Sequence, residues 1–236
     1  MNELGQAGGG RRAAVVAIDG PSGSGKSSVA RAVAARLGFV YLDTGAMYRA
    51  VGLLAREAGV SPDDDEAVTE VAAAADLRVT GDGRVYAGAR DLSAAIRTLA
   101  AGELASRVSA LPGVRRLLAE RQRALAGERG LVVEGRDIGT HVFPDAAVKI
   151  YLTASPDVRA ERRLRQLLAA GHEATFSDVL ADVCARDRRD SGRAVAPLRC
   201  ADDAVVIDST ALTLDEVVAM VEDVVRRRLR TPEGVS

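Results

Sequence analysis

Short apolar runs alternate along the chain with longer segments in which apolar residues recur at helical spacing. The short runs predict five buried strands, over residues 13–19, 39–43, 131–134, 148–152 and 204–208. The longer segments predict helices over residues 27–37, 47–58, 96–110, 114–126, 156–170, 177–190 and 213–229. Because such strands alternate with helices, we expect an α/β fold in which a parallel five-stranded sheet is covered by helices on both faces.

Local signals mark where three of the later helices begin. Ser155 followed by Pro156 is typical of an N-cap with proline at the first helical position. Ser177 is expected to cap the next helix. Thr213 and Glu216 have the spacing of a capping box, so we expect the last helix to begin there.

One segment departs from this alternation. Residues 77–92 read LRVT, then Gly-Asp-Gly, then RVYAG, which predicts a β-hairpin and hence a small antiparallel insertion. Residues 1–12 are polar and rich in glycine, so we expect a disordered leader, and residues 232–236 a disordered tail. The remainder, residues 13–231, is expected to form a single domain.

Composition excludes several classes of protein. The chain is 47% hydrophobic and 28% charged, as in soluble globular proteins. Its net charge of −1 and its 3% aromatic content argue against a dedicated nucleic-acid binder. Two histidines and two cysteines without ligand spacing argue against a zinc site or a disulfide framework. The apolar runs are too short for a membrane span and the N-terminus does not resemble a signal peptide, so we expect a cytoplasmic protein.

The first predicted strand leads into a phosphate-binding motif. The segment GPSGSGKS, residues 20–27, satisfies G-x-x-x-x-G-K-[ST] between a strand and a helix. Glycines let backbone N–H groups surround a phosphate, and the helix N-terminus adds partial positive charge. Lys26 is expected to reach the β- and γ-phosphates of a nucleotide, and Ser27 to offer its hydroxyl to Mg²⁺. Arginine outnumbers lysine heavily in this chain, so a lysine at this position is notable, because a compact ammonium suits the phosphates better than a planar guanidinium does.

The second lysine argues against one class of nucleotide-binding protein. Regulatory GTPases carry an N-K-x-D motif that reads guanine. Lys149 lies in AVKI, so this chain does not have that motif, and a GTPase switch is not expected.

Arginines follow two of the predicted strands. Arg49 comes shortly after residues 39–43, and Arg136 and Asp137 come directly after residues 131–134. Ligands of open α/β sheets lie beyond the carboxyl ends of the strands. Two arginines and a carboxylate at that edge therefore predict a second anionic substrate site, although an exposed salt bridge is the alternative for either arginine alone.

Residues 159–199 contain many more arginines. Arg186, Arg189, Asp190 and Arg193 have the spacing of one helical face, provided that the helix continues that far. A face of this kind is expected to meet an anion, for example as a mobile cover over a transferring phosphoryl group. The alternative is an exposed face on which neighbouring aspartates serve as counter-ions.

Five segments of the chain resemble one known family. They are GPSGSGKSS, LDTGAMYRA, EGRDIGTHVFPDAAVKIYL, RDRRDSGRAVAPL and DDAVVIDST. In this order they resemble bacterial cytidylate (CMP) kinases, which are nucleoside monophosphate kinases, and the second, third and fourth are specific to that family. The resemblance implies a P-loop NTPase-type fold with an NMP-binding region over about residues 44–110, which holds the β-insertion, and an arginine-rich lid over about residues 156–199.

The resemblance also implies roles for individual residues. ATP would be bound by the first of these segments, that is by Gly20, Pro21, Ser22, Gly23, Ser24, Gly25, Lys26, Ser27 and Ser28. CMP would be bound through its phosphate by Arg49, Arg136 and Arg193, through its base by Thr44, Arg115 and Asp137, and through its sugar by Ser106, Arg186 and Asp190. Catalysis would rest on Lys26, Arg136, Arg186 and Arg193. The chain departs from the family pattern at Ser28, where threonine is common, and at Ser191-Gly192 within the lid motif.

The implied reaction transfers the γ-phosphoryl group of ATP, with Mg²⁺, to CMP or dCMP, in pyrimidine nucleotide metabolism. The implied partners are small nucleotides, with neither nucleic acid nor membrane, and the implied state is a monomer. Two alternatives stay open from the residues themselves. One is a small P-loop kinase for UMP, GMP, dTMP or shikimate, and the other is an ATP-driven module that binds RNA through the arginine-rich segment.

Overall fold

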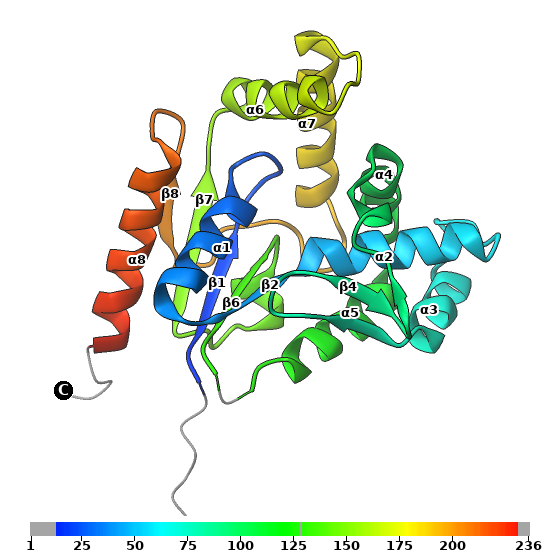
Figure 1. Cartoon of the computed structure of the whole chain (residues 1–236), viewed down its shortest axis with the longest axis horizontal. Helices are drawn as coiled ribbons and strands as arrows, with labels where there is room; N and C mark the ends of the chain where they lie inside the picture. Colours follow the sequence, from blue (N-terminus) through cyan, green and yellow to red (C-terminus); the bar gives the residue numbers. More distant parts are fainter. Residues whose placement is uncertain (1–12, 128, 231–236) are drawn as a thin grey trace, which may run out of the picture.

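A computed structural model describes residues 13–127 and 129–230 of the chain (Figure 1). The expected leader, residues 1–12, and tail, residues 232–236, lie outside the described residues. The central sheet is five-stranded and parallel throughout, in the order β2-β6-β1-β7-β8. Its strands are β1 (Val15–Asp19), β2 (Val40–Asp43), β6 (Leu131–Gly135), β7 (Val148–Thr153) and β8 (Val205–Asp208). The predicted strands and the predicted α/β class are confirmed.

Helices cover both faces of this sheet. One face packs against α1 (Lys26–Leu37) and α8 (Leu214–Arg230), and the other against α2 (Thr44–Glu57), α3 (Asp65–Ala74) and α5 (Pro112–Ala124). The alternation of side chains along a strand explains the two layers, because Val16 and Ile18 belong to the first cluster and Ala17 to the second. The capping box at Thr213 and Glu216 is present at the start of α8.

The insertion has three strands rather than the two of the predicted hairpin. They are β3 (Leu77–Val79), β4 (Val85–Ala87) and β5 (Arg90–Asp91), which form a separate antiparallel sheet. The extra strand follows a second tight turn at Gly88, whose φ of 58° suits a residue without a side chain. Leu92 then packs with Val85 against the outer side of α2, which ties the insertion to the core.

Several helix boundaries differ from the prediction because polar side chains cap the backbone. The helix expected over residues 96–110 is divided into η1 (Ala95–Arg97) and α4 (Leu99–Val108), since Thr98 accepts a hydrogen bond from Ala101 N at 3.2 Å. Thr175, not Ser177, caps α7 (Phe176–Ser191). Helix α3 and the short η2 (Ile138–Val142) were not predicted.

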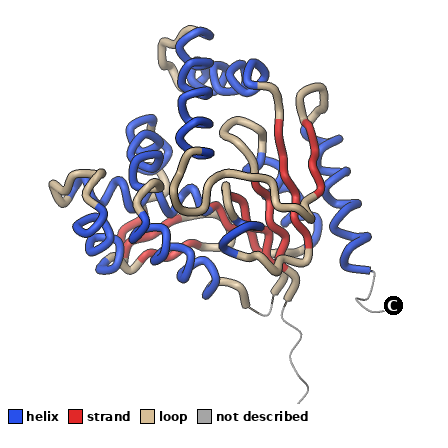
Figure 2. The backbone as a smooth tube through the Cα atoms, turned by 180° about the vertical axis from the view of Figure 1, so that it is seen from behind, coloured by secondary structure: helices blue, strands red, loops and turns tan. Residues whose placement is uncertain are grey.

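Two helices stand beyond the carboxyl ends of the sheet. These are α6 (Pro156–Ala169), which starts at the predicted Ser155 cap, and α7 (Figures 1 and 2). They share a small apolar cluster of Ala160, Val179 and Val183, separate from the clusters on the sheet. Among the residues that the structure describes, no helix combines the length and the apolarity that crossing a membrane requires.

Candidate active site

The phosphate-binding motif forms the loop between β1 and α1. Gly23 and Gly25 have φ angles of 80° and 95°, in the region that favours glycine. A Cβ on Gly20 would lie 2.0 Å from the carbonyl oxygen of Leu152, so a side chain has no room there. Gly25 is the N-cap of α1 and offers no side chain to the first turn. The first N–H groups of α1 are therefore left for an external anion, as expected for a phosphate cradle.

Lys26 lies beneath this loop. Its Nζ donates to the carbonyl oxygen of Pro21 at 2.6 Å and to Ser24 Oγ at 3.3 Å. Burial, and then the positive charge of Arg136, hold the pKa of Lys26 well below its ordinary value. The ammonium is thus fixed at the loop and is near a second cationic group, which an anionic ligand between them would compensate.

A carboxylate that was not among the predicted site residues completes this region. Glu134, the buried acid near the end of β6, accepts a hydrogen bond from Ser27 Oγ at 2.9 Å through one oxygen and from the Tyr41 hydroxyl through the other. Burial, and then Asp43, raise the pKa of Glu134. Its position in LVVE, at the carboxyl end of a central strand, is the signal that could have identified it.

The side chains of Ser27 and Glu134 are two groups at this loop that could bind a magnesium ion. Hydroxyl and carboxylate oxygens are ligands that Mg²⁺ accepts, and Mg²⁺ commonly takes one or two protein oxygens together with phosphates and water. The described residues hold no cluster of three or more acidic, histidine or cysteine ligands that would form a complete protein cage. The pair therefore fits a metal that arrives with a nucleotide.

The predicted phosphate-binding arginines are brought together by an aspartate of α7. Asp190 is buried and accepts from Arg136 Nε at 2.8 Å and from Arg193 Nη2. Arg49 is held separately, by Asp43 Oδ2 at 2.9 Å and the carbonyl oxygen of Gly45. In this structure Asp190 thus contacts both arginines, which link the end of β6 to the end of α7.

Arg186 differs from these arginines because no carboxylate among the described residues is in direct contact with it. Among the described residues it has neither a hydrogen bond nor an ion pair, and its Nε is buried. Burial, followed by the positive charge of Arg136, lowers the pKa of Arg186 to about 10; Asp190 opposes the shift in part, and Arg49 and Arg163 add to it. This group of four arginines, Arg49, Arg136, Arg163 and Arg186, is the arginine cluster; Arg49 and Arg136 have aspartate partners, whereas Arg186 has no ion pair among the described residues.

The predicted base-reading residues form a buried pair. Arg115 is 2% exposed and donates to Asp137 Oδ2 at 2.5 Å and to the carbonyl oxygen of Ser109 at 3.0 Å. Thr44 is buried at the start of α2 and donates to the carbonyl oxygen of Glu134 at 2.7 Å. Ser106, on α4, accepts from Arg189 at 3.2 Å, so the residues predicted for base and sugar come from four helices and from the loop after β6.

The single helical face predicted for the arginines of α7 is not fully formed. Helix α7 ends at Ser191 with Gly192 as its C-cap, so Arg193 lies outside the helix, although it still reaches Asp190. Arg189 turns to Ser106 instead of joining the others. Helical spacing therefore predicted the neighbourhood of these residues but not their individual directions.

Two further residues connect the phosphate loop to its surroundings. Arg159 of α6 is buried, donates to the carbonyl oxygen of Ser22 at 3.1 Å and pairs with Asp187 of α7 at 2.7 Å. Asp19, the last residue of β1, accepts from the N–H groups of Ile138 and Gly139 at 2.8 and 2.7 Å. Burial raises the pKa of Asp19 to about 6. These contacts hold α6 and the Arg136 loop in fixed positions relative to the cradle.

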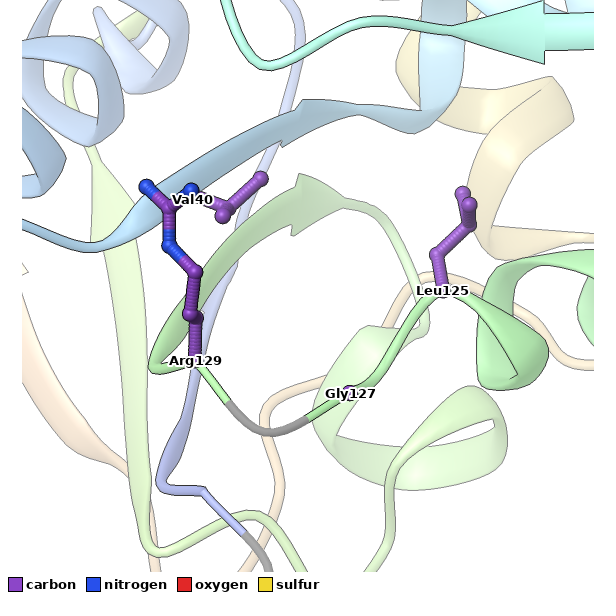
Figure 3. Close-up of a pocket in the computed structure, with 4 residues that line it drawn as sticks. All are labelled: Val40, Leu125, Gly127 and Arg129. Atoms are coloured by element: carbon purple, nitrogen blue, oxygen red, sulfur yellow. The ribbon is translucent and has the colours of Figure 1, made fainter.

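A surface hollow lies at the other end of the sheet. It has a volume of about 290 Å³ and is lined by Val40, Leu125, Gly127 and Arg129 (Figure 3). Val40 begins β2 and Arg129 comes just before β6, so the hollow is at the amino ends of the strands. It shares no residue with the cradle or the arginine cluster, and we assign it no part in the site.

Comparison with known proteins gives a consistent result. Residues 16–227 match the family model of cytidylate kinase. A cytidylate kinase from Geobacter sp. (strain M21) is 50% identical over 218 residues, covering 91% of this chain and 94% of that protein. One from Geobacter sulfurreducens is 48% identical over 228 residues, covering 95% and 98%. The crystal structure of an uncharacterized protein from Eubacterium ventriosum is similar with a TM-score of 0.50 at 12% identity, over 92% of this chain and 99% of that one, which concerns the fold alone.

Proposed function

The chain belongs to the cytidylate kinase family, and from this premise we propose that it transfers the γ-phosphoryl group of ATP to CMP or dCMP, giving ADP and CDP or dCDP. The observation that carries the proposal is the arginine cluster beside the phosphate loop. Arg186 makes no hydrogen bond or ion pair among the described residues, and burial, followed by the charge of Arg136, lowers the pKa of both Arg186 and Lys26. Two phosphate groups, one from each nucleotide, are the ligands that would relieve this repulsion.

On the donor side, we assign residues 20–28 to the phosphates of ATP. The N–H groups at the start of α1 would surround the β-phosphate, and Lys26 would neutralise charge on the transferring group. Ser27, with Glu134 behind it, would hold Mg²⁺. When bound, the metal would neutralise part of the charge on the phosphate oxygens.

On the acceptor side, we assign the arginines around Asp190 to CMP. Its phosphate would be bound by Arg49, Arg136 and Arg193, its base by Thr44, Arg115 and Asp137, and its sugar by Ser106, Arg186 and Asp190. Arginine suits these tasks because its planar fork binds phosphate oxygens in pairs. Asp190 would keep Arg136 and Arg193 aligned before the acceptor arrives.

For this reaction the protein has mainly to position the two nucleotides and to neutralise the charge of their phosphates. The acceptor is a phosphate and is ionised at neutral pH, so the reaction needs no strong general base. We propose that α6 and α7, within the lid of about residues 156–199, close over the two nucleotides and exclude water. Arg159 would then connect the cradle to the lid, since it contacts Ser22 on one side and Asp187 on the other. Exclusion of water would limit the hydrolysis of ATP.

The test is a panel of acceptors. The purified chain would be incubated with Mg·ATP and, in separate reactions, CMP, dCMP, UMP, GMP, dTMP or shikimate, and ADP release would be measured. We expect release with CMP and dCMP, less with UMP, and background with the others. Release driven by shikimate or GMP would assign the acceptor site to another small P-loop kinase. Salt-sensitive retention of RNA without acceptor-dependent ADP release would favour the RNA-binding alternative.

We further propose a cytoplasmic monomer without nucleic-acid partners. The near-neutral charge supports the second part, because nucleic-acid binders usually carry a basic excess. Light scattering during gel filtration, with and without nucleotides, tests the monomer directly. A mass of two chains would contradict it.

A further inference from the structure

We propose that Tyr41 is a positioning residue that fixes the Glu134 carboxylate toward Ser27, and that the first turn of the insertion, residues 81–83, keeps Tyr41 in place. The inference rests on the proposed function, in which Ser27 and Glu134 hold the magnesium ion of ATP. It gives the insertion a part in the donor half of the site, although its strands pack against α2.

The first step is the geometry at Glu134. Tyr41 is a buried residue of β2, and its hydroxyl donates to Glu134 Oε1. Ser27 Oγ donates to the other oxygen, Oε2, at 2.9 Å. Because each carboxylate oxygen has its own donor, the plane of the carboxylate is set. The last torsion of a glutamate is otherwise broad, so loss of the phenol would leave this group free to turn away from Ser27.

The second step is what holds the tyrosine ring. The guanidinium of Arg31, on α1, lies 4.8 Å from the ring centre of Tyr41, in the arrangement of a cation–π contact. Arg31 Nη1 also donates to the carbonyl oxygen of Asp82 at 3.4 Å. Arg31 thus connects the turn of the insertion to the ring that supports Glu134.

The third step is how closely the turn approaches. A Cβ on Gly83 would lie 3.4 Å from Arg31 Nη1 and 3.6 Å from Tyr41 Cε1, so the turn comes close to both groups. Gly83 has a φ of 82°, which favours glycine. The contacts therefore run from the turn through Arg31 and Tyr41 to Glu134, and from there to Ser27.

The experiment compares Tyr41→Phe with a matched control. The variant keeps the ring and its contact with Arg31 but removes the hydroxyl. Tyr86→Phe is the control, because Tyr86 is also a tyrosine beneath an arginine, with Arg78 at 5.8 Å, but it lies in β4. Calorimetry measures ATP binding with Mg²⁺ and with EDTA, and steady-state kinetics gives the Mg²⁺ concentration for half-maximal kcat.

A charge-assisted hydrogen bond of this kind corresponds to roughly tenfold in an equilibrium. We expect Tyr41→Phe to raise the half-saturating Mg²⁺ concentration about tenfold and to reduce the Mg²⁺-dependent gain in ATP affinity by the same factor. ATP binding in EDTA and the KM for CMP should stay at their wild-type values. Tyr86→Phe should match the wild type in all four measurements.

Two results would overturn the inference while the proposed function stands. One is a wild-type Mg²⁺ dependence in Tyr41→Phe, and the other is an equal loss of ATP binding in EDTA, which would make Tyr41 merely structural. By contrast, a wild-type chain that neither binds ATP more tightly with Mg²⁺ nor phosphorylates CMP would refute the proposed function itself.

A second variant keeps the inference testable if Tyr41→Phe fails to fold. Arg31→Ala removes an exposed side chain that joins the turn to the ring and leaves the phenol in place. We expect it to raise the half-saturating Mg²⁺ concentration two- to threefold, that is by about 0.5 kcal/mol, in line with an exposed cation–π contact. If Arg31→Ala had the wild-type half-saturating Mg²⁺ concentration, the insertion would have no part in positioning Tyr41.

Discussion

The donor and acceptor halves of the site are built by different means. The phosphate loop is closed by local contacts, because Lys26 and Ser24 donate to Pro21, a few residues earlier in the chain, and Glu134 and Arg159 then reach it from distant segments. The acceptor half is assembled from distant segments. Arg136 and its partner Asp190 are 54 residues apart, and Arg115 and Asp137 are 22 apart. The donor half can therefore form with the core, whereas the acceptor half depends on where α4, α5 and α7 lie.

The two halves also differ in how their charges are compensated. Most acceptor arginines already have an aspartate, so a nucleotide would compete with or join an existing ion pair. The arginine cluster still lacks an anion at Arg186, beside the cradle. The difference indicates that the acceptor half is arranged in advance by ion pairs, and that the free positive charge is concentrated where the phosphoryl group would pass between the two halves.

The largest effect is expected from the donor half. Lys26→Ala should lower kcat about 10³-fold, because the ammonium acts on the transferring group, while the KM for CMP changes little. The measurement is steady-state kinetics, with circular dichroism to verify the fold. Lys26→Arg should also be badly impaired, since a planar guanidinium does not replace a compact charge.

Lys149→Ala is the matched control for this prediction. Lys149 is the second lysine of the chain and lies on β7, away from the cradle. Its Nζ pairs with Asp203 at 2.9 Å. The Lys149→Ala enzyme should keep the wild-type kcat. A Lys26→Ala enzyme with more than about a tenth of the wild-type activity would show that the loop is not the phosphate cradle.

The next effect concerns the contact between the halves at Asp19. The pKa of this buried carboxyl is raised from about 3.8 to about 6, so the folded protein holds this proton more tightly than the unfolded chain does. The ionised Asp19 carboxylate destabilises the folded protein. This destabilisation is fully present well above pH 6 and disappears as the pH falls through 6 toward 4. Relative to Asp19→Asn, the wild type should therefore gain about 2 kcal/mol of unfolding free energy between pH 7 and pH 4.

Denaturant unfolding of both proteins at several pH values measures this gain. Asp145→Asn, at an exposed turn, is the control, and its difference from the wild type should not follow the same course. If the difference between wild type and Asp19→Asn were constant over this range, or grew as the pH rose, Asp19 would not carry a buried charge at neutral pH.

Arg186 gives the clearest contrast between stability and activity. Arg186→Ala should lower kcat about 10²-fold, because a positive charge aimed at the transferring group is lost. It should also raise the melting temperature, since it removes a buried charge that is repelled by Arg136, and these two costs exceed the attraction of Asp190. Kinetics and thermal unfolding of the same preparation test both parts.

Arg188→Ala serves as the control for Arg186→Ala. Arg188 lies on the same helix, α7, but is exposed, so its removal should change neither quantity appreciably. An Arg186→Ala protein that is less stable than the wild type would indicate that this arginine is a structural group with an unrecognised partner.

The two halves also differ in how much of their structure could be predicted from the sequence. The cradle and the five strands were predicted, because a motif of eight residues and the run of apolar positions are local signals. Helix α3 was not predicted, because Asp64 caps it within a run of aspartates that resembles a turn. The third strand of the insertion was not predicted either, because β5 is only two residues long and shows no alternating pattern.

Within the site, position along a strand was a better guide than spacing along a helix. Arg49 and Arg136 were expected beyond strand ends, and the structure brings both into the arginine cluster. Glu134 could have been predicted on the same ground. The double contact of Asp190 could not, because it depends on the orientation of α7 over the sheet and on Arg193 turning back past the end of that helix.

The smallest effect concerns the choice of base at Asp137. Its Oδ2 accepts from Arg115, and among the described residues this carboxylate has no other hydrogen bond, which leaves Oδ1 for a ligand. Cytosine offers an N4 amino donor at the edge where uracil has the O4 acceptor. A carboxylate accepts from the amino group but repels O4, and an unpaired group in a closed site costs about 1–3 kcal/mol.

Asp137→Ala should therefore lose much of its kcat/KM with CMP and little with UMP, so that the ratio between them narrows about tenfold. Asp137→Asn tests the same point with the side-chain volume kept, because Arg115 is buried and would otherwise face an empty space. Arg115→Ala should weaken both acceptors and change the ratio less, since a pure donor binds the edge that the two bases share. If the CMP to UMP ratio stayed at its wild-type value in both Asp137 variants, Asp137 would serve to hold Arg115 and would not read the base.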